Sequence, residues 1–271
     1  MKNITDIIIK DNLIISIGIS FMKKKIIQFG FLSSMTLLCA SETKIDMIST
    51  FQQNPNNIYF GPEAFCLDLN THFKDVKVNG SKLFLGLQLG YEYLKPDAFY
   101  FGINILAAGG NHGFHESFHR VHIPQSNGLS GFVNLELRFG YTVFGSQWLT
   151  TPFLCIGGYS FGSGSNHHHF DAGASYLGGG VRFRYAFSNT FNLGTNFKIF
   201  GSMYRDERWR YSEVKEVTHH GLWGGEIGIP LIWRVGSKKR WDIQLEPYFL
   251  KLNFAEVQNV YGTRLIFGYH F

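Results

Sequence analysis

The chain lacks a long apolar run and is poor in charge. After residue 41 no stretch approaches the ~20 consecutive apolar residues that a membrane-spanning helix requires. Charged residues make up only 17% of the 271 residues, whereas Phe, Tyr and Gly number 27, 13 and 31, which is high for an ordinary soluble enzyme. The apolar residues are dispersed in alternation with polar and small ones. This distribution favours strands with one apolar face over helices.

A large excess of positive charge is also absent from most of the chain. The formal net charge is +5, but residues 1–41 hold five Lys and two Asp, so the remainder carries +2. A nearly balanced chain gives no reason to predict a nucleic-acid partner.

Residues 22–41 have the organisation of an export signal. Three Lys follow Met22, residues 26–38 are apolar, and small residues occupy positions −3 (Cys39) and −1 (Ser41) before Glu42. This arrangement predicts a secretory signal peptide, too short to span a membrane as a helix. Lipid attachment at Cys39 is disfavoured because Leu38 stands where a small residue is needed. Residues 1–21 precede a complete signal, so we predict an upstream extension and a true start at Met22; a long charged n-region is the alternative.

The end of the chain alternates strictly over residues 260–271. One face carries Phe271, Tyr269 and Phe267, and the other carries His270, Gly268 and Arg264. A period of two predicts a strand with one apolar face. This ending resembles the closing strand of bacterial outer-membrane β-barrels, which typically ends in Phe after aromatics at alternate positions. In that family the barrel-assembly machinery recognises the terminal strand. The resemblance implies that the assembly signal consists of Phe267, Tyr269 and Phe271.

Nine further segments are predicted to be strands of the same kind. Short turns follow the even-numbered strands and longer connections follow the odd-numbered ones, among them a hairpin signal at Asn79 and Gly80. The ten strands predict an all-β, transmembrane, antiparallel up-and-down β-barrel. Eight and twelve strands stay open, because two segments (59–71 and 149–161) are the least regular. The nine segments are residues 59–71, 83–93, 99–105, 129–143, 149–161, 177–187, 191–203, 223–233 and 241–249.

The resemblance implies a division of the chain into an export part and a barrel. Residues 42–57 are expected to form a periplasmic lead-in, and residues 58–271 an outer-membrane barrel with long loops outside. Cys66 and Cys155 fall on distant strands and opposite faces. We therefore predict no disulfide, and thiols that are buried or face lipid.

By the same alternation, several charged side chains are predicted to point into the barrel. A polar pathway for small solutes is one interpretation, and a salt-bridge network that fills a narrow lumen is the other. We favour the network, because a barrel of ten strands encloses little space and because opposite signs permit the pairing that buried charges need. The residues are Glu92, Glu136, Arg138, Arg182, Arg184, Lys198, Glu226, Glu246 and Arg264.

Most histidines fall in the predicted external loops. If residues 113–121 form a short helix, the first four share one stripe and could bind zinc or copper, or could gain charge at low pH and act as a gate. Ordinary solvated loops are the favoured interpretation. The candidate metal ligands are His112, His115, His119, His122, His167, His168 and His169; the third loop adds His219 and His220.

Loop residues also bear on two further functions, proteolysis and adhesion. Some ten-strand barrels are proteases with paired Asp and a His–Asp dyad at the external rim. Here the rim carboxylates (Asp171, Asp206, Glu207 and Glu256) show no Asp–Asp pair at a strand end, so we predict no enzymatic activity. Adhesion to an anionic glycan or lipopolysaccharide would use cations and aromatics near residues 205–215, including Arg208 and Arg210. Interspersed acidic residues favour a mixed solvated hairpin there.

The sequence therefore predicts a monomeric outer-membrane barrel, exported through the general secretory pathway, with a structural or surface-exposed role and at most a narrow pore. The alternatives are an adhesin for anionic host glycans, a metal-binding or pH-sensitive channel that uses the loop histidines, and an outer-membrane hydrolase. The expected partners are outer-membrane lipid, lipopolysaccharide and the barrel-assembly machinery, with a host glycan or surface ligand for the adhesin. No cofactor is expected, apart from zinc or copper in the metal-binding alternative.

Overall fold

The computed structural model describes a barrel built from the C-terminal part of the chain. The described residues are 54–73, 76–113, 115–118, 121–122, 127–164, 169–210, 214–218, 223–236, 240–252 and 257–271. The predicted extension, the signal peptide and the lead-in up to residue 53 lie outside them. No described residue belongs to a helix of the length and hydropathy needed to cross a membrane.

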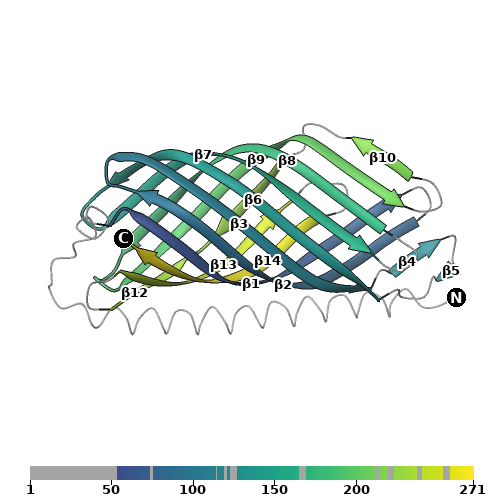
Figure 1. Ribbon diagram of the computed structural model, residues 1–271, viewed down its shortest axis with the longest axis horizontal. Coiled ribbons are helices and arrows are strands. Elements are labelled where there is room, and N and C mark those ends of the chain that lie inside the picture. Colours follow the sequence, from purple (N-terminus) through teal and green to yellow (C-terminus); the bar gives the residue numbers. More distant parts are fainter. Residues whose placement is uncertain are drawn as a thin grey trace, which may run out of the picture. The chain divides into compact units, whose positions relative to one another are not determined.

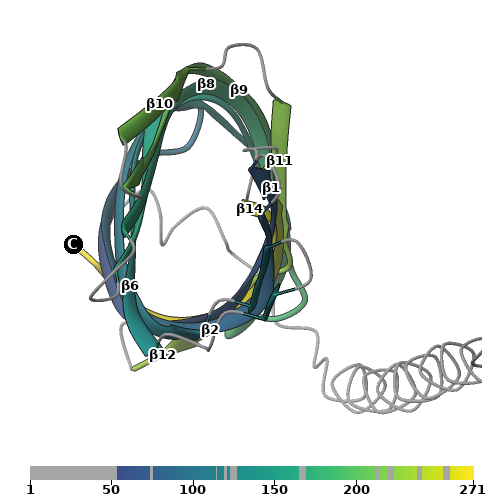
Figure 2. The same cartoon turned by 90° about the vertical axis from the view of Figure 1, so that its right-hand side faces the viewer.

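Ten long antiparallel strands make the wall of the barrel, which confirms the predicted fold and strand number. Figure 1 shows them running obliquely along the barrel, and Figure 2 shows the closed oval ring that they form. In chain order the wall consists of β1 (Asn56–Phe73), β2 (Val76–Leu94), β3 (Ala98–Gly113), β6 (Asn127–Phe144), β7 (Trp148–Gly164), β8 (His169–Ala186), β9 (Phe191–Arg210), β11 (Trp223–Gly228) continued by β12 (Leu231–Val235), β13 (Trp241–Lys251) and β14 (Val257–His270).

The first and last strands close the ring. β1 pairs with β2 on one side and with β14 on the other, in a register that sets Phe60 opposite Phe267 and Glu63 opposite Arg264. The last rung joins Phe271 to Asn56 through a backbone hydrogen bond of 2.9 Å from Phe271 N to Asn56 O. Closure matters because an unpaired strand edge in hydrocarbon would cost several kcal/mol for each polar group.

Proline splits the eighth strand of the wall. Pro230 has no N–H to donate, and β11 ends just before Ile229 while β12 begins just after Pro230. Both halves pair with β9 and β13, so they remain one member of the wall. Two hydrogen bonds bridge the interruption, from Gly194 N to Pro230 O (2.9 Å) and from Ile229 N to Pro247 O (3.0 Å).

Several predicted loops are wrong, because the strands continue beyond the alternating segments. Asn79 and Gly80 lie within β2, and the β1–β2 ladder extends to Phe73 and Val76. The ladders of β3–β6, β7–β8 and β8–β9 also extend beyond the predicted ends, and β10 (Val214–Thr218) folds back on β9. Backbone pairing does not need an apolar face, whereas alternation is visible in the sequence only where there is one.

The helix considered for residues 113–121 is also wrong. The described part of this segment forms β4 (His115–Phe118), which pairs with β2, and β5 (Val121–His122), which pairs with β4. The three short strands β4, β5 and β10 lie at one end of the barrel, and the C-terminus lies at the other (Figure 1). Short turns at residues 95–97, 145–147 and 187–190 occupy the end with the C-terminus, as predicted.

Alternation puts apolar side chains outside the barrel and polar ones inside. On β2, Leu87 and Leu89 are 69% and 54% exposed, whereas Gln88 between them is 7% exposed. This is the arrangement of a transmembrane barrel, in which the outer face contacts lipid. On β1 the apolar row formed by Phe65 and Leu67 points inward, with exposures of 1% and 0%. This apolar row therefore belongs to the lumen.

Candidate functional site

The interior of the barrel is the candidate site, because charged side chains from most of the wall meet there. The structure places all nine predicted lumen residues inside. Their side chains are largely buried, with Arg138 and Arg264 the most accessible at 16% and 13%. From the end with the long connections to the end with the short turns, the interior has an aromatic layer, a central ion-pair cluster and a second charged layer.

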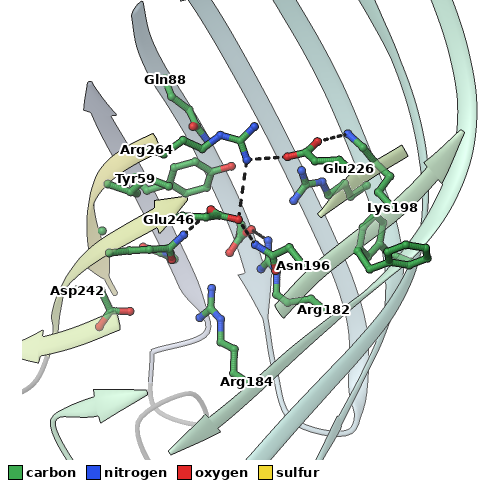
Figure 3. A pocket seen from close by; sticks show the side chains of 18 residues that line it. Tyr59, Gln88, Arg182, Arg184, Asn196, Lys198, Glu226, Asp242, Glu246 and Arg264 are labelled. Carbon is green, nitrogen blue, oxygen red and sulfur yellow. Dashed lines mark hydrogen bonds and ion pairs between the residues drawn. The ribbon is translucent and has the colours of Figure 1, made fainter. Parts of the chain in front are cut away.

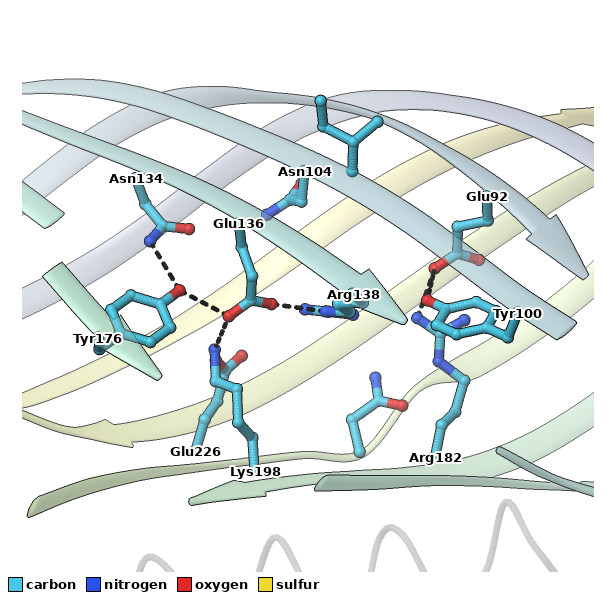
Figure 4. Close-up of polar contacts among 12 residues, drawn as sticks. Glu92, Tyr100, Asn104, Asn134, Glu136, Arg138, Tyr176, Arg182, Lys198 and Glu226 are labelled. Carbon is cyan, nitrogen blue, oxygen red and sulfur yellow. Dashed lines mark hydrogen bonds and ion pairs between the residues drawn. The ribbon is translucent and has the colours of Figure 1, made fainter. Parts of the chain in front are cut away.

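The central cluster is organised around Glu136 on β6. Its carboxylate accepts hydrogen bonds from Arg138 Nε (2.5 Å), Lys198 Nζ (2.6 Å) and the Tyr176 hydroxyl (2.6 Å), as Figure 4 shows. Glu136 is 1% exposed. A carboxylate at this depth requires such charge-assisted partners, because burial removes its hydration.

Ion pairs continue from Lys198 across the lumen. Lys198 Nζ lies 2.9 Å from Glu226, which in turn accepts from Arg264 Nη1 at 2.7 Å. Arg264 also lies 3.4 Å from Glu63 and 3.9 Å from Glu246. The chain of contacts therefore links β6, β9, β11, β14 and β1.

Glu63 and its partner Tyr248 were not among the predicted lumen residues. The Tyr248 hydroxyl donates to Glu63, and the Arg264 guanidinium stacks 3.8 Å from the centroid of the Tyr248 ring. Glu63 was missed because Pro62 and the inward Phe65 obscure the alternation of β1. The acidic residue among apolar neighbours in that segment was the available signal.

An aromatic layer covers the central cluster on the side of the long connections. Phe65 stacks on Phe84 (5.2 Å between centroids) and contacts Phe132 edge-on (5.5 Å). Tyr176 links this layer to the charges, because its ring lies 4.9 Å from Tyr159 while its hydroxyl contacts Glu136. None of these rings was among the predicted lumen residues. Phe84 and Phe132 occupy the polar phase of their strands, which was the signal for them.

Inward glycines leave room for these large side chains. The Tyr59 ring occupies the space that a Cβ at Gly90 would fill, and the Tyr248 ring does the same at Gly262. By contrast, a Cβ at the outward Gly131 would meet no described atom within 4 Å. Glycine in the lumen is therefore part of its packing.

The second charged layer lies toward the short turns. Glu92 accepts from Arg182 (2.5 Å) and from the Tyr100 hydroxyl (3.2 Å), as Figure 4 also shows. Asp242 lies 2.8 Å from His270 Nε2 and 3.6 Å from Arg234 Nε. A cavity of about 710 Å³, a volume that includes solvent-open space, extends between this layer and the central cluster (Figure 3).

A second cavity of about 380 Å³ lies between the central cluster and the aromatic layer. The two cavities share four lining residues: Arg138, Lys198, Glu226 and Arg264. The ion-pair cluster therefore separates the two spaces.

The loop candidates are only partly described. His112, His115, His122 and His169 lie on β3, β4, β5 and β8, whereas His119, His167, His168, His219, His220 and Glu256 lie outside the described residues. Within the described ranges no group of His, Cys, Asp or Glu has the arrangement of a metal site.

The other loop candidates lie on strands. Asp171 is exposed on β8, and Asp206 and Glu207 lie in the β9–β10 hairpin together with Arg208 and Arg210. Cys155 is buried and Cys66 half-buried, both without a disulfide.

Comparison with known proteins supports the fold. No family model matches the chain, and no curated protein matches it in sequence. The outer-membrane protease OmpT from Escherichia coli is similar in structure, with a TM-score of 0.52 and 8% identity over 81% of this chain and 97% of that one. The translocator domain of the autotransporter NalP from Neisseria meningitidis gives a TM-score of 0.45 and 9% identity over 83% and 92%. At 8% identity the likeness to OmpT concerns the fold alone, that of a closed antiparallel barrel.

Proposed function

We propose that this protein is an outer-membrane β-barrel with a structural or surface-exposed role, and that its own side chains close its lumen. The observation that carries the proposal is the filled interior, where an aromatic layer and a cluster of ion pairs lie across the barrel one above the other. The outward leucines and aromatics support a position in lipid. The closed wall supports it further, because a lipid-facing sheet must have no edge.

The closed lumen follows from how the interior is occupied. In the central cluster each carboxylate is held by a cation, and Lys198 and Arg264 are each shared between carboxylates. Opening a path would require separating several of these pairs in a poorly hydrated space, which is unfavourable. The proposal assigns no catalysis to the interior, because the same contacts hold its carboxylates in pairs.

Conductance of the refolded barrel in a planar lipid bilayer tests the proposal. We expect no regular conductance steps from the unmodified protein. Phe200 also belongs to the aromatic layer, because its buried ring lies 4.8 Å from that of Tyr176. A variant that combines Glu226→Ala, Arg264→Ala, Phe65→Ala and Phe200→Ala removes one buried pair together with two rings, and it should conduct. A matched control with four outward substitutions (Leu83→Ala, Leu85→Ala, Leu154→Ala and Leu177→Ala) should stay silent. Regular steps from the unmodified barrel would contradict the closed lumen.

A further inference from the structure

Arg184 is a buried cation without a counter-ion. It lies on β8 two residues after Arg182, faces the lumen and is 6% exposed. Among the described residues no hydrogen-bond partner meets its Nε, and no carboxylate forms an ion pair with it. A buried charge without a partner is costly, so an arrangement that retains one calls for a physical explanation.

Both nearby carboxylates already have other neighbours. Glu92 is held by Arg182 and Tyr100. Asp242 contacts His270 through Oδ2, and its Oδ1, which has no hydrogen-bond partner among the described residues, lies 3.6 Å from Arg234 Nε. The layer near the short turns therefore contains three arginines and two carboxylates. The central cluster contains three cations (Arg138, Lys198 and Arg264) and four carboxylates (Glu63, Glu136, Glu226 and Glu246). In these two layers the formal charges of the Arg, Lys, Asp and Glu side chains cancel, but the layer near the short turns holds one more arginine than carboxylates.

Arg184 and Arg182 line the larger cavity together. Figure 3 shows the Arg184 guanidinium directed into this space, with no dashed contact to it. Arg182 offers a second donor, because its Nη1 is buried and lacks a hydrogen-bond partner. Two arginines from one strand thus line the same cavity, and each has a buried N–H donor without a hydrogen-bond partner among the described residues.

We propose that Arg184, assisted by Arg182 Nη1, binds a small oxyanion in this cavity, of the carboxylate or phosphate class. The planar guanidinium fork matches the paired oxygens of these groups, and each hydrogen bond to it is strengthened by charge. A bound oxyanion supplies the counter-charge that Arg184 lacks. Glu92 remains with Arg182 Nη2, so binding does not break the existing pair. The inference does not depend on whether the lumen conducts.

Calorimetric titration of the refolded barrel with inorganic phosphate and, separately, with acetate tests the site and distinguishes the two classes. At constant ionic strength, one of these anions should bind saturably at one site per barrel. Arg184→Met should abolish that binding, and Arg184→Lys, which keeps the charge but loses the fork, should weaken it at least several-fold. Lys251→Gln removes an exposed cation on the outer surface and serves as the control for non-specific attraction.

A thermal unfolding series provides a second measurement. The binding anion should raise the melting temperature of the unmodified barrel and of Lys251→Gln, but not that of Arg184→Met. Without anion, Arg184→Met should be at least as stable as the unmodified barrel, because the substitution removes an uncompensated buried charge. The proposal is overturned if neither anion binds saturably, or if Arg184→Met binds as well as the unmodified protein.

Discussion

Glu136 joins three strands through one carboxylate. It accepts from Arg138 on its own strand β6, from Tyr176 on β8 and from Lys198 on β9. Lys198 keeps a second partner in Glu226, whereas Arg138 has Glu136 as its carboxylate partner among the described residues. Removing the Glu136 charge therefore leaves a buried arginine without its pair.

We expect Glu136→Gln to lower the free energy of unfolding by about 3 kcal/mol, the usual scale for breaking a buried pair from one side. Urea titration of the barrel in lipid vesicles, followed by tryptophan fluorescence, measures this change. Asp171→Asn is the matched control, because it neutralises an exposed carboxylate and should change stability by less than about 0.5 kcal/mol. Equal effects of the two substitutions would refute a stabilising role for the cluster.

At the scale of single residues, the sequence predicted the inward face better than the contacts. Alternation placed Glu136, Lys198 and Glu226 on the inner face of their strands. It did not indicate that Lys198 lies between the two glutamates. That contact depends on the stagger of β6, β9 and β11 around the ring, which no single strand determines.

Among the strands, β14 closes the wall, because it pairs with β1. Its last rung is made by Phe271, whose carbonyl accepts from Asn56 N (3.3 Å) and whose N–H donates to Asn56 O (2.9 Å). The Phe271 ring lies on the outer face beside Tyr269, 6.3 Å away between centroids. Phe271 therefore contributes both a backbone rung and an exposed ring.

Deleting Phe271 should reduce the amount of folded barrel in the membrane several-fold, because both the last backbone pairing with Asn56 and the predicted assembly signal are lost. The measurement is the heat-modifiable fraction on gels of membrane preparations. Phe271→Ala keeps the two backbone hydrogen bonds to Asn56 and removes only the aromatic side chain, so it separates the two contributions. An unchanged folded fraction after the deletion would argue against the proposed signal.

The extended strand ends show why element boundaries were harder to predict than elements. β7 and β8 pair as far as Gly164 and His169, through a segment rich in Gly, Ser and His. Their outer face in that region does not need to be apolar, so no alternation marks it. The helical interpretation of residues 113–121 was wrong for a related reason. The spacing of the histidines carries no information about strand pairing, and it is the pairing of β4 with β2 that makes this segment extended.

The barrel formed by the described residues exposes apolar side chains on its outer face and encloses charged side chains together with the aromatic layer. Leu87 lies at mid-strand on β2, opposite Pro62 on β1 and Ala107 on β3, and is 69% exposed. An exposed leucine row of this kind would be unfavourable in water and is favourable against lipid chains.

Leu87→Arg should therefore destabilise the inserted barrel by ~2–4 kcal/mol, the range for an arginine near the middle of the bilayer. Unfolding in vesicles measures the effect. Leu87→Ala removes the same side chain without adding charge, and it should cost clearly less. A Leu87→Arg barrel as stable as Leu87→Ala would place this face outside the hydrocarbon.

The sequence by itself determined the closed antiparallel class, favoured ten strands over eight or twelve, and predicted the short turns at one end and the inward face of the nine predicted lumen charges. These properties follow from a period of two along single strands and from the requirement for a barrel without edges. The tertiary structure alone decided which charges meet, that Phe65 and Leu67 fill the lumen, and that Arg184 is left without a carboxylate. The physical reason is that pairing across the lumen depends on register and stagger summed around the ring, whereas alternation specifies only inside or outside.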